Sequence, residues 1–199
     1  MKILLFLKAP RLGFVKTRLA KDLGPAGALS AYRQMLQATV EVLCPFPNVA
    51  LRYTPDDSTD EVGSWAKPGW RLEPQGDGDL GERLTRAFAD AFANGANPVV
   101  AIGSDCPYVS AADLREAQDL LQTNDVVLGP AVDGGYWLIG TRRALPQLFE
   151  GIDWSTERVF EQTCRAANVA GLTVARLRTL SDVDTSEDWQ RWQTILGKP

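Results

Sequence analysis

The order of the apolar segments along the chain constrains its fold most strongly. Seven runs have the composition of short strands, at residues 2–7, 48–53, 70–72, 98–102, 125–128, 136–139 and 171–177. Apolar residues recur at helical spacing in the segments between them, at residues 25–43, 60–65, 81–94, 111–122, 156–167 and 186–195. This alternation predicts a three-layer α/β/α sandwich around a mostly parallel sheet. A glycine-rich turn joins the two strands of 125–140, which predicts one antiparallel element in a mixed sheet.

Length and composition narrow the class of protein. A chain of 199 residues is expected to form a single domain, 1–199. Its net charge of −4 does not support binding to nucleic acid. Its first apolar run is too short to span a membrane. The three cysteines are scattered, so we expect reduced thiols in a cytoplasmic protein. The chain has no histidine, which excludes Ser-His-Asp, Cys-His and histidine–zinc chemistry.

Asp105 is the first candidate site residue. It stands in the segment Gly-Ser-Asp-Cys-Pro-Tyr, directly after the apolar run 98–102, and would therefore lie at the carboxyl end of a buried strand. Ligands of open α/β sheets bind at that end. An acid with no basic residue nearby in sequence suits a divalent cation that bridges phosphates, although a turn or helix-capping role fits the same residue type.

A basic loop follows the first strand. Lys8, Arg11, Lys16 and Arg18 are able to converge on phosphate oxygens there, and Gly13 allows a turn that brings backbone amides close to an anion. The alternative is a solvated basic loop. Phosphate binding is favoured because the cations follow the carboxyl end of a strand.

Two glycine-containing turns are weaker signals. Residues 76–81 match the pattern G-x-G-x-x-G, but Asp77 and Asp79 would repel a pyrophosphate, which leaves contact with a base or ribose, or a plain turn. The segment 133–137, Asp-Gly-Gly-Tyr-Trp, allows close approach of a ligand and also fits a tight hairpin turn.

Asp182 and Asp184 precede the last predicted helix, for which Thr185 or Ser186 is the expected N-cap. Capping explains neither aspartate. One of them would supply the second carboxylate that a metal held by Asp105 needs.

Together these motifs resemble one family. The segments KAPRLGFVKTRLA, GDLGERL, GSDCP, GPAVDGGYWLIG, IDWST and SDVDTSEDW follow the order seen in a bacterial family of glycosyltransferases. That family belongs to the nucleotide-diphospho-sugar transferase superfamily, with the glycosyltransferase A-type fold. The chain also resembles the guanylyltransferases of molybdenum-cofactor and phospholactate metabolism. The glycosyltransferases usually carry a true Asp-x-Asp, whereas here Asp105 stands between Ser104 and Cys106, a metal site closer to that of the nucleotidyltransferases.

The resemblance implies a role for each motif. Lys16 and Arg18 would bind nucleotide phosphates, with Lys16 and Asp105 as the catalytic pair. Asp105 and Asp184 would hold Mg²⁺ or Mn²⁺. The nucleoside would lie near Gly78, Leu80 and Gly81. The acceptor or sugar would lie near Asp133, Gly134, Gly135 and Tyr136.

The predicted function is a metal-dependent transferase acting on a nucleotide or nucleotide-sugar and a small-molecule acceptor. Without histidine, the general base is a carboxylate, or none is needed when the acceptor is already a phosphate. This favours nucleotidyl transfer slightly over glycosyl transfer. A non-catalytic nucleotide or sugar-phosphate sensor is the contrasting alternative, and a homodimer is left open.

Overall fold

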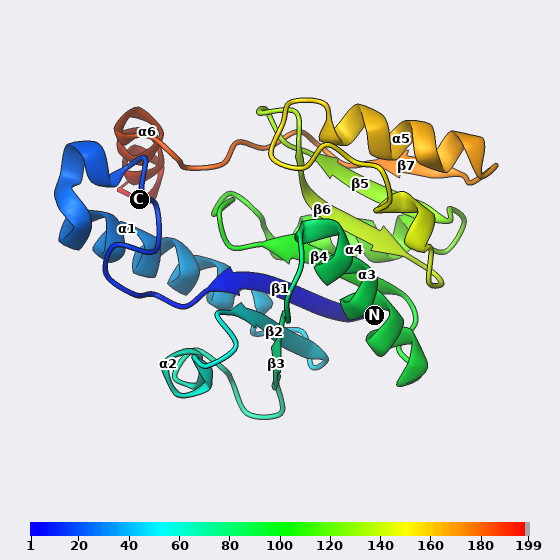
Figure 1. Ribbon diagram of the computed structural model, residues 1–199, viewed down its shortest axis with the longest axis horizontal. Coiled ribbons are helices and arrows are strands. Elements are labelled where there is room, and N and C mark those ends of the chain that lie inside the picture. Colours follow the sequence, from blue (N-terminus) through cyan, green and yellow to red (C-terminus); the bar gives the residue numbers. More distant parts are fainter. Residues whose placement is uncertain (198–199) are drawn as a thin grey trace.

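A computed structural model describes residues 1–197 and contains the predicted alternation of strands and helices. The strands are β1 (Lys2–Lys8), β2 (Val49–Thr54), β3 (Arg71–Pro74), β4 (Val99–Gly103), β5 (Val126–Pro130), β6 (Tyr136–Thr141) and β7 (Val174–Arg176). The helices are α1 (Ala20–Leu43), α2 (Thr59–Gly63), α3 (Leu80–Ala93), α4 (Ala111–Leu120), α5 (Val159–Val169) and α6 (Ser186–Leu196), with a 3₁₀ turn at Pro146–Leu148. Figure 1 shows the sheet between layers of helices.

The seven strands form one mixed sheet in the order β3-β2-β1-β4-β6-β5-β7. Strand β6 runs antiparallel to both β4 and β5, and every other neighbouring pair is parallel. The expected antiparallel element is therefore confirmed. The strand order reverses between β1 and β4, because the chain adds β2 and β3 on one side of β1 and the later strands on the other. Such a switch point is where open α/β sheets bind ligands.

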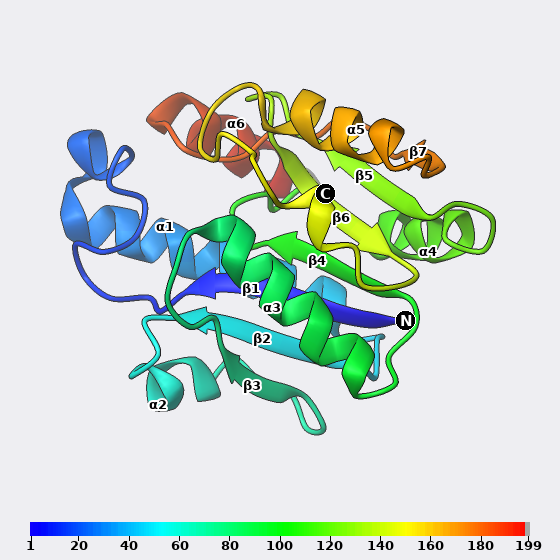
Figure 2. The same cartoon turned by 45° about the vertical axis from the view of Figure 1, so that its right-hand side comes forward.

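Two apolar layers cover the sheet, one on each face. Side chains alternate along β1, so that Ile3, Leu5 and Leu7 belong to the layer packed by α1, α4 and α6. Leu4 belongs to the layer packed by α3 and α5, and half-buried Phe6 packs against it. Figure 2 shows α3 lying across β1 and β2 on this second face. The core thus fixes both faces of the strand whose end opens into the site.

The N-cap of the last helix is one of the two residues predicted for it, whereas the starts of α1 and α5 differ from the prediction. Ser110 and Thr185 each accept a hydrogen bond from the backbone amide three residues on, and close a capping box. Helix α1 starts at Ala20, within the segment expected to be a loop, but its path breaks at Gly24, where φ is +68°. Helix α5 starts at Val159 instead of 156, after a turn in which Ser155 has φ +64°.

Candidate functional site

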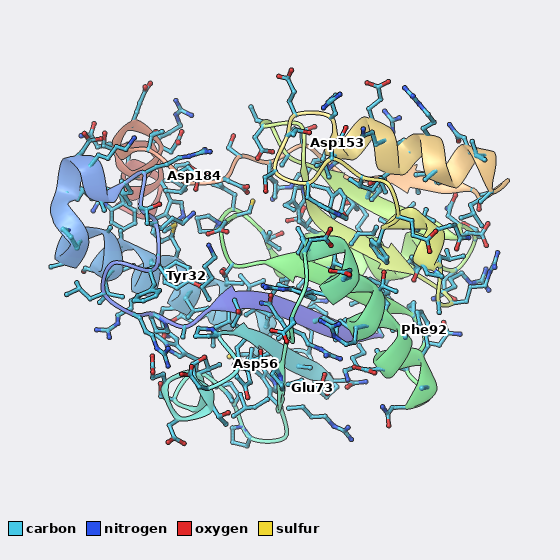
Figure 3. The ribbon with its side chains drawn as sticks, in the orientation of Figure 1. Tyr32, Asp56, Glu73, Phe92, Asp153 and Asp184 are labelled. Atoms are coloured by element: carbon cyan, nitrogen blue, oxygen red, sulfur yellow. The ribbon has the colours of Figure 1, made fainter. Side chains whose placement is uncertain are left out.

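The ends of β1 and β4 are tied together by one buried tyrosine. The hydroxyl oxygen of Tyr32 accepts a hydrogen bond from the Lys8 amide at 3.0 Å and lies 2.9 Å from the Lys8 carbonyl. It also lies 3.0 Å from Ser104 Oγ. Burial, followed by the negative charge of Asp105, raises the pKa of Tyr32, so the hydroxyl stays protonated. Tyr32 thereby fixes the point from which both the basic loop and Asp105 leave the sheet (Figure 3).

Lys16 lies between two carboxylates at this edge. Its Nζ is 2.7 Å from Asp105 Oδ1 and 2.9 Å from Asp184 Oδ1, and its side chain is only 4% exposed. Burial lowers the pKa of Lys16. The two carboxylates raise it by more than burial lowers it, so the pKa lies above its ordinary value. Lys16 is therefore an ammonium ion. The backbone at Lys16 has φ +48°, a left-handed conformation that L side chains rarely adopt.

This arrangement corrects one expectation. The sequence places no cation near Asp105, yet the structure supplies Lys16 through the fold of the first loop. The same bonds place Asp105 and Asp184 side by side, because an oxygen of each contacts one nitrogen. The structure thus brings Asp105, Asp184 and Lys16 together, with Lys16 in the position between the two acids.

Asp182 is a third acid at the same place. The Val183 amide donates to the Asp105 carbonyl at 3.1 Å, which holds segment 182–184 alongside Asp105. Burial first, and then the charges of Asp105 and Asp133, raise the pKa of Asp182 to about 7. Burial contributes more to this shift than either of these carboxylates does, and Lys16 opposes it.

The donor set fits a hard divalent cation. Asp105 and Asp184 present carboxylate oxygens from side chains 55% and 40% exposed, so both are accessible. After burial, the carboxylates of Asp105 and Asp133 contribute to the raised pKa of Asp182, and a dication would offset that part of the shift. Oxygen-only donors suit Mg²⁺ or Mn²⁺. Among residues 1–197, no three or more acidic, cysteine or histidine side chains already form a metal-binding cluster.

The other cations of the basic loop diverge. Arg18 is 78% exposed and approaches Asp184 Oδ2 at 3.6 Å, so it stays near the group. Arg11 instead binds Glu61 at 2.7 Å and Asp57 at 3.0 Å, beside α2. Lys8 is exposed at the end of β1, and Gly13 has φ +81° with open space around it. The structure joins Lys16 and Arg18 to the acids, and it places Arg11 in a separate ion-pair network.

The turn before β6 packs against the segment that leads into α5. Asp133 Oδ1 accepts a hydrogen bond from the Gly135 amide, and the Gly134 carbonyl accepts one from the Phe160 amide. The Tyr136 hydroxyl is buried without a hydrogen-bond partner, and its ring meets Trp154 edge-on with centroids 6.4 Å apart. Asp133 is thus the exposed group of the four predicted acceptor-binding residues, while Tyr136 points into the protein.

We expect Gly134→Ala to destabilise the protein by about 2–4 kcal/mol, from overpacking and backbone strain together. A Cβ at Gly134 would lie 2.1 Å from the Glu157 carbonyl oxygen, and its φ is +87°. The matched control is Gly151→Ala, where φ is +66° but no atom lies within 4 Å of the added Cβ. Strain alone should cost it about 1 kcal/mol. Urea unfolding measures both, and equal losses would contradict the close contact at Gly134.

The glycine-containing loop 76–81 lies at the same edge of the sheet. Gln75, which precedes it, donates from Nε2 to the carbonyls of Leu7 and Arg52 at the ends of β1 and β2. Gly81 has no room for a side chain, since a Cβ would lie 2.6 Å from both Phe149 O and Trp154 Nε1. Gly78 has φ +98°, and Leu80 is 43% exposed. The three residues predicted to lie near a nucleoside are therefore next to the end of β1.

An ion pair holds the C-terminal segment in place. Buried Asp113 accepts hydrogen bonds from Arg178 Nε at 2.6 Å and Nη2 at 2.8 Å, and Arg178 also donates to the Tyr108 carbonyl. Trp137 Nε1 donates to the Arg178 carbonyl. These bonds fix the start of the segment that carries Asp182 and Asp184 to Asp105. Sequence analysis did not identify Arg178, because its partners are distant in the chain.

Asp113 should make stability depend on pH. Burial raises the pKa of Asp113, but the hydrogen bonds from Arg178 and Ser110 lower it more, so its pKa is below the ordinary value. The stabilisation is therefore complete above about pH 4 and is lost as pH falls through the lowered pKa. We expect the free energy of unfolding of Asp113→Asn to fall less between pH 5 and pH 3 than that of the parent protein. Thermal unfolding at several pH values measures this, and parallel curves would contradict it.

The chain is similar to known proteins in sequence and in structure. The sequence model of the bacterial family described as "Uncharacterized protein conserved in bacteria (DUF2064)" matches residues 39–156. No curated protein sequence matches the chain. A solved protein of Desulfovibrio desulfuricans G20, assigned as a nucleotide-diphospho-sugar transferase, is 34% identical with a TM-score of 0.93. The match covers 100% of this chain and 89% of that one.

Two more distant structures share the fold. Molybdopterin-guanine dinucleotide biosynthesis protein A of Archaeoglobus fulgidus is 13% identical with a TM-score of 0.62, over 100% of both chains. Protein Rv0371c of Mycobacterium tuberculosis H37Rv, solved as a manganese complex, is 18% identical with a TM-score of 0.55, over 96% of this chain and 97% of that one. The fold predicted by resemblance, that of the nucleotide-diphospho-sugar transferases, is therefore confirmed. Separately, within residues 1–197 no helix has both the length and the apolar character to cross a bilayer.

Proposed function

This chain belongs to the DUF2064 family, and from that premise we propose that it is a divalent-metal-dependent transferase acting on a nucleotide or nucleotide-sugar. The observation that carries the proposal is the convergence of Lys16, Asp105 and Asp184 where the strand order reverses. Proteins with this fold supply further support, since one is named for molybdopterin-guanine dinucleotide biosynthesis and another was solved with manganese.

Asp105 and Asp184 would hold Mg²⁺ or Mn²⁺. A divalent cation supplies positive charge to phosphate oxygens and to the leaving group. Lys16 supplies a second, fixed positive charge in a position shielded from water, where electrostatic interactions are stronger than in bulk solvent. Arg18 is mobile enough at 78% exposure to close on a bound phosphate. Tyr32 keeps the ends of β1 and β4 in register, so that these groups stay aligned.

The type of transfer follows from the available bases. With no histidine in the chain, activation of a hydroxyl acceptor would fall to a carboxylate. A phosphorylated acceptor needs no such base, which favours nucleotidyl transfer to a phosphorylated small molecule. Glycosyl transfer from a nucleotide-sugar is the second candidate, supported by the name of the Desulfovibrio protein. We place the enzyme in the cytoplasm, on account of its three free cysteines.

The first experiment is thermal unfolding with nucleoside triphosphates and nucleotide-sugars, with and without Mg²⁺. A ligand at 100 times its Kd stabilises by about 2.7 kcal/mol, which raises the Tm of a chain of this size by roughly 5–10 °C. Stabilisation that requires metal supports a transferase, and stabilisation that ignores metal supports a sensor. Mass spectrometry of mixtures with phosphorylated acceptors then separates nucleotidyl from glycosyl products. Absence of any nucleotide binding would contradict the proposal.

A further inference from the structure

Arg83 is the half-buried arginine that the fold leaves without a carboxylate. It lies in the second turn of α3, and its Nη1 donates to Gln75 Oε1 at 3.3 Å. Its Nε is buried and has no hydrogen-bond partner. Within residues 1–197, no acidic side chain forms an ion pair with it. A guanidinium has five N–H donors, so most of its hydrogen-bonding capacity is unused.

Other arginines withdrawn from solvent are neutralised. Arg52 pairs with Glu73 at 2.9 Å and Asp90 at 3.2 Å, and Arg178 pairs with Asp113 at 2.6 Å. Arg86, three residues after Arg83 on the same helix, donates to the carbonyls of Gln75 and Asp77 and so supports the loop. Arg52, Arg86 and Arg178 are therefore each held by acceptors of the protein itself, with carboxylates at Arg52 and Arg178 and carbonyls at Arg86. Arg83 differs, because it has no carboxylate partner in the part of the chain that the structure describes. An unpaired, partly desolvated charge lowers stability unless a ligand supplies the missing acceptors.

Gln75 fixes where this charge lies. Its side chain is 6% exposed, and its amide nitrogen donates to the Leu7 carbonyl at 3.1 Å and to the Arg52 carbonyl at 2.9 Å. Its Oε1 is thus committed to Arg83. Because Leu7 is the residue before Lys8, Arg83 is anchored at the carboxyl end of β1, on the face covered by α3 (Figure 2). Lys16 and its two acids, by contrast, lie at the β1–β4 junction.

Lys8 adds a second cation on that face. Leu4 and Phe6 of β1 both contact the layer packed by α3, and by alternation the Lys8 side chain leaves the strand on the same side. Lys8 is exposed and forms no ion pair within the described residues. The two cations flank the start of loop 76–81, in which Gly76 and Gly78 have positive φ and pack against the side chains of Arg86 and Glu82. Acids stand nearby, but Asp56 Oδ1 accepts a hydrogen bond from the Gly76 amide, and Asp79 and Glu82 cap α3, so that within residues 1–197 none of the three forms an ion pair with Arg83 or Lys8.

We propose that Arg83, assisted by Lys8, binds an oxyanion group of a substrate, at a position separate from Lys16. The inference rests on the proposed function for the identity of that substrate, but the anion-binding position stands on the geometry alone. A planar guanidinium matches a phosphate or carboxylate through two parallel hydrogen bonds. The oxyanion belongs either to the nucleotide or to the second substrate, and the two sources are separated by experiment.

The test compares Arg83→Gln and Arg83→Lys with the parent by calorimetric titration of inorganic pyrophosphate, of the four nucleoside triphosphates with Mg²⁺, and of glucose 1-phosphate. We expect at least tenfold weaker binding for Arg83→Gln, with partial recovery in Arg83→Lys because the charge returns without the fork. Arg165→Gln is the matched control, since Arg165 is 71% exposed and pairs only with Glu161 on α5. It should bind all probes as the parent does.

The outcomes distinguish the two sources of the oxyanion, and they distinguish a binding role of Arg83 from a structural one. Loss with the triphosphates assigns the oxyanion to the nucleotide, and loss with glucose 1-phosphate alone assigns it to the second substrate. Unchanged binding of every probe, pyrophosphate included, overturns the inference. A Tm for Arg83→Gln well below that of the parent, with unchanged binding, would show a structural role instead. Failure of the parent to bind any nucleotide would contradict the proposed function, while the pyrophosphate titration would still decide the role of Arg83.

Discussion

Asp105→Asn is expected to lower turnover by about 10²–10³-fold, the usual cost of removing one electrostatic contact to a transition state. The asparagine keeps the shape of the side chain but removes the charge that would hold a divalent cation. It also removes one of the two carboxylates that orient Lys16. The measurement is turnover of the substrate pair identified by mass spectrometry, over a range of Mg²⁺ concentrations. Excess metal should recover part of the activity if the lost contact is to the metal.

Folding should be nearly unaffected by this substitution. Asp105 is 55% exposed, and Lys16 retains Asp184, so we expect a change of about 1 kcal/mol or less. Asp119→Asn on α4 is the control, because Asp119 is an exposed acid away from this edge of the sheet. It should leave turnover unchanged. Full Mg²⁺-dependent turnover in Asp105→Asn would show that Asp105 is not a metal ligand.

The parts of the site that depend on local sequence could be predicted. Asp105 follows an apolar run that becomes β4, and the carboxyl end of that strand is determined by where the run stops. The N-cap of α6 was predicted to within one residue, as Thr185 or Ser186, because the capping partner of Thr185 lies three residues away in the chain. The antiparallel pairing of β5 with β6 followed from a short turn, which leaves two strands no room to be parallel.

The parts that depend on contacts between distant segments could not be predicted. The position of Lys16 between Asp105 and Asp184 results from the path of the first loop, in which Lys16 itself adopts a left-handed conformation in addition to Gly13. The missing hydrogen-bond partner of Arg83 Nε can be recognised only once α3 is placed on the sheet. In the same way, the pairing of Arg11 with Glu61 depends on where α2 packs. The sequence around a basic loop residue does not indicate which acidic side chain it will pair with.

Lys16→Met should lower kcat/KM by about 10²–10³-fold and, in the same protein, strengthen the binding of Mg²⁺ alone. Methionine keeps the buried apolar stem and removes the ammonium. The lost ammonium would bind phosphate oxygens during turnover, which accounts for the fall in activity. In the absence of nucleotide, the same ammonium contacts Asp105 and Asp184 and repels a dication. We therefore expect the Kd for Mg²⁺ or Mn²⁺ alone to fall by about tenfold, equivalent to about 1.4 kcal/mol.

Stability provides an independent measure of the same charge. Without Lys16, Asp105, Asp182 and Asp184 repel one another, so the metal-free variant should lose about 1–3 kcal/mol. Millimolar Mg²⁺ should restore most of this loss, and Lys21→Met, which removes an exposed lysine at the start of α1, should show neither effect. If Lys16 binds phosphate but does not affect metal binding, Lys16→Met will have reduced activity with an unchanged Kd for Mg²⁺. That result would mean that the acids bind their cation elsewhere than at the position of the Lys16 ammonium.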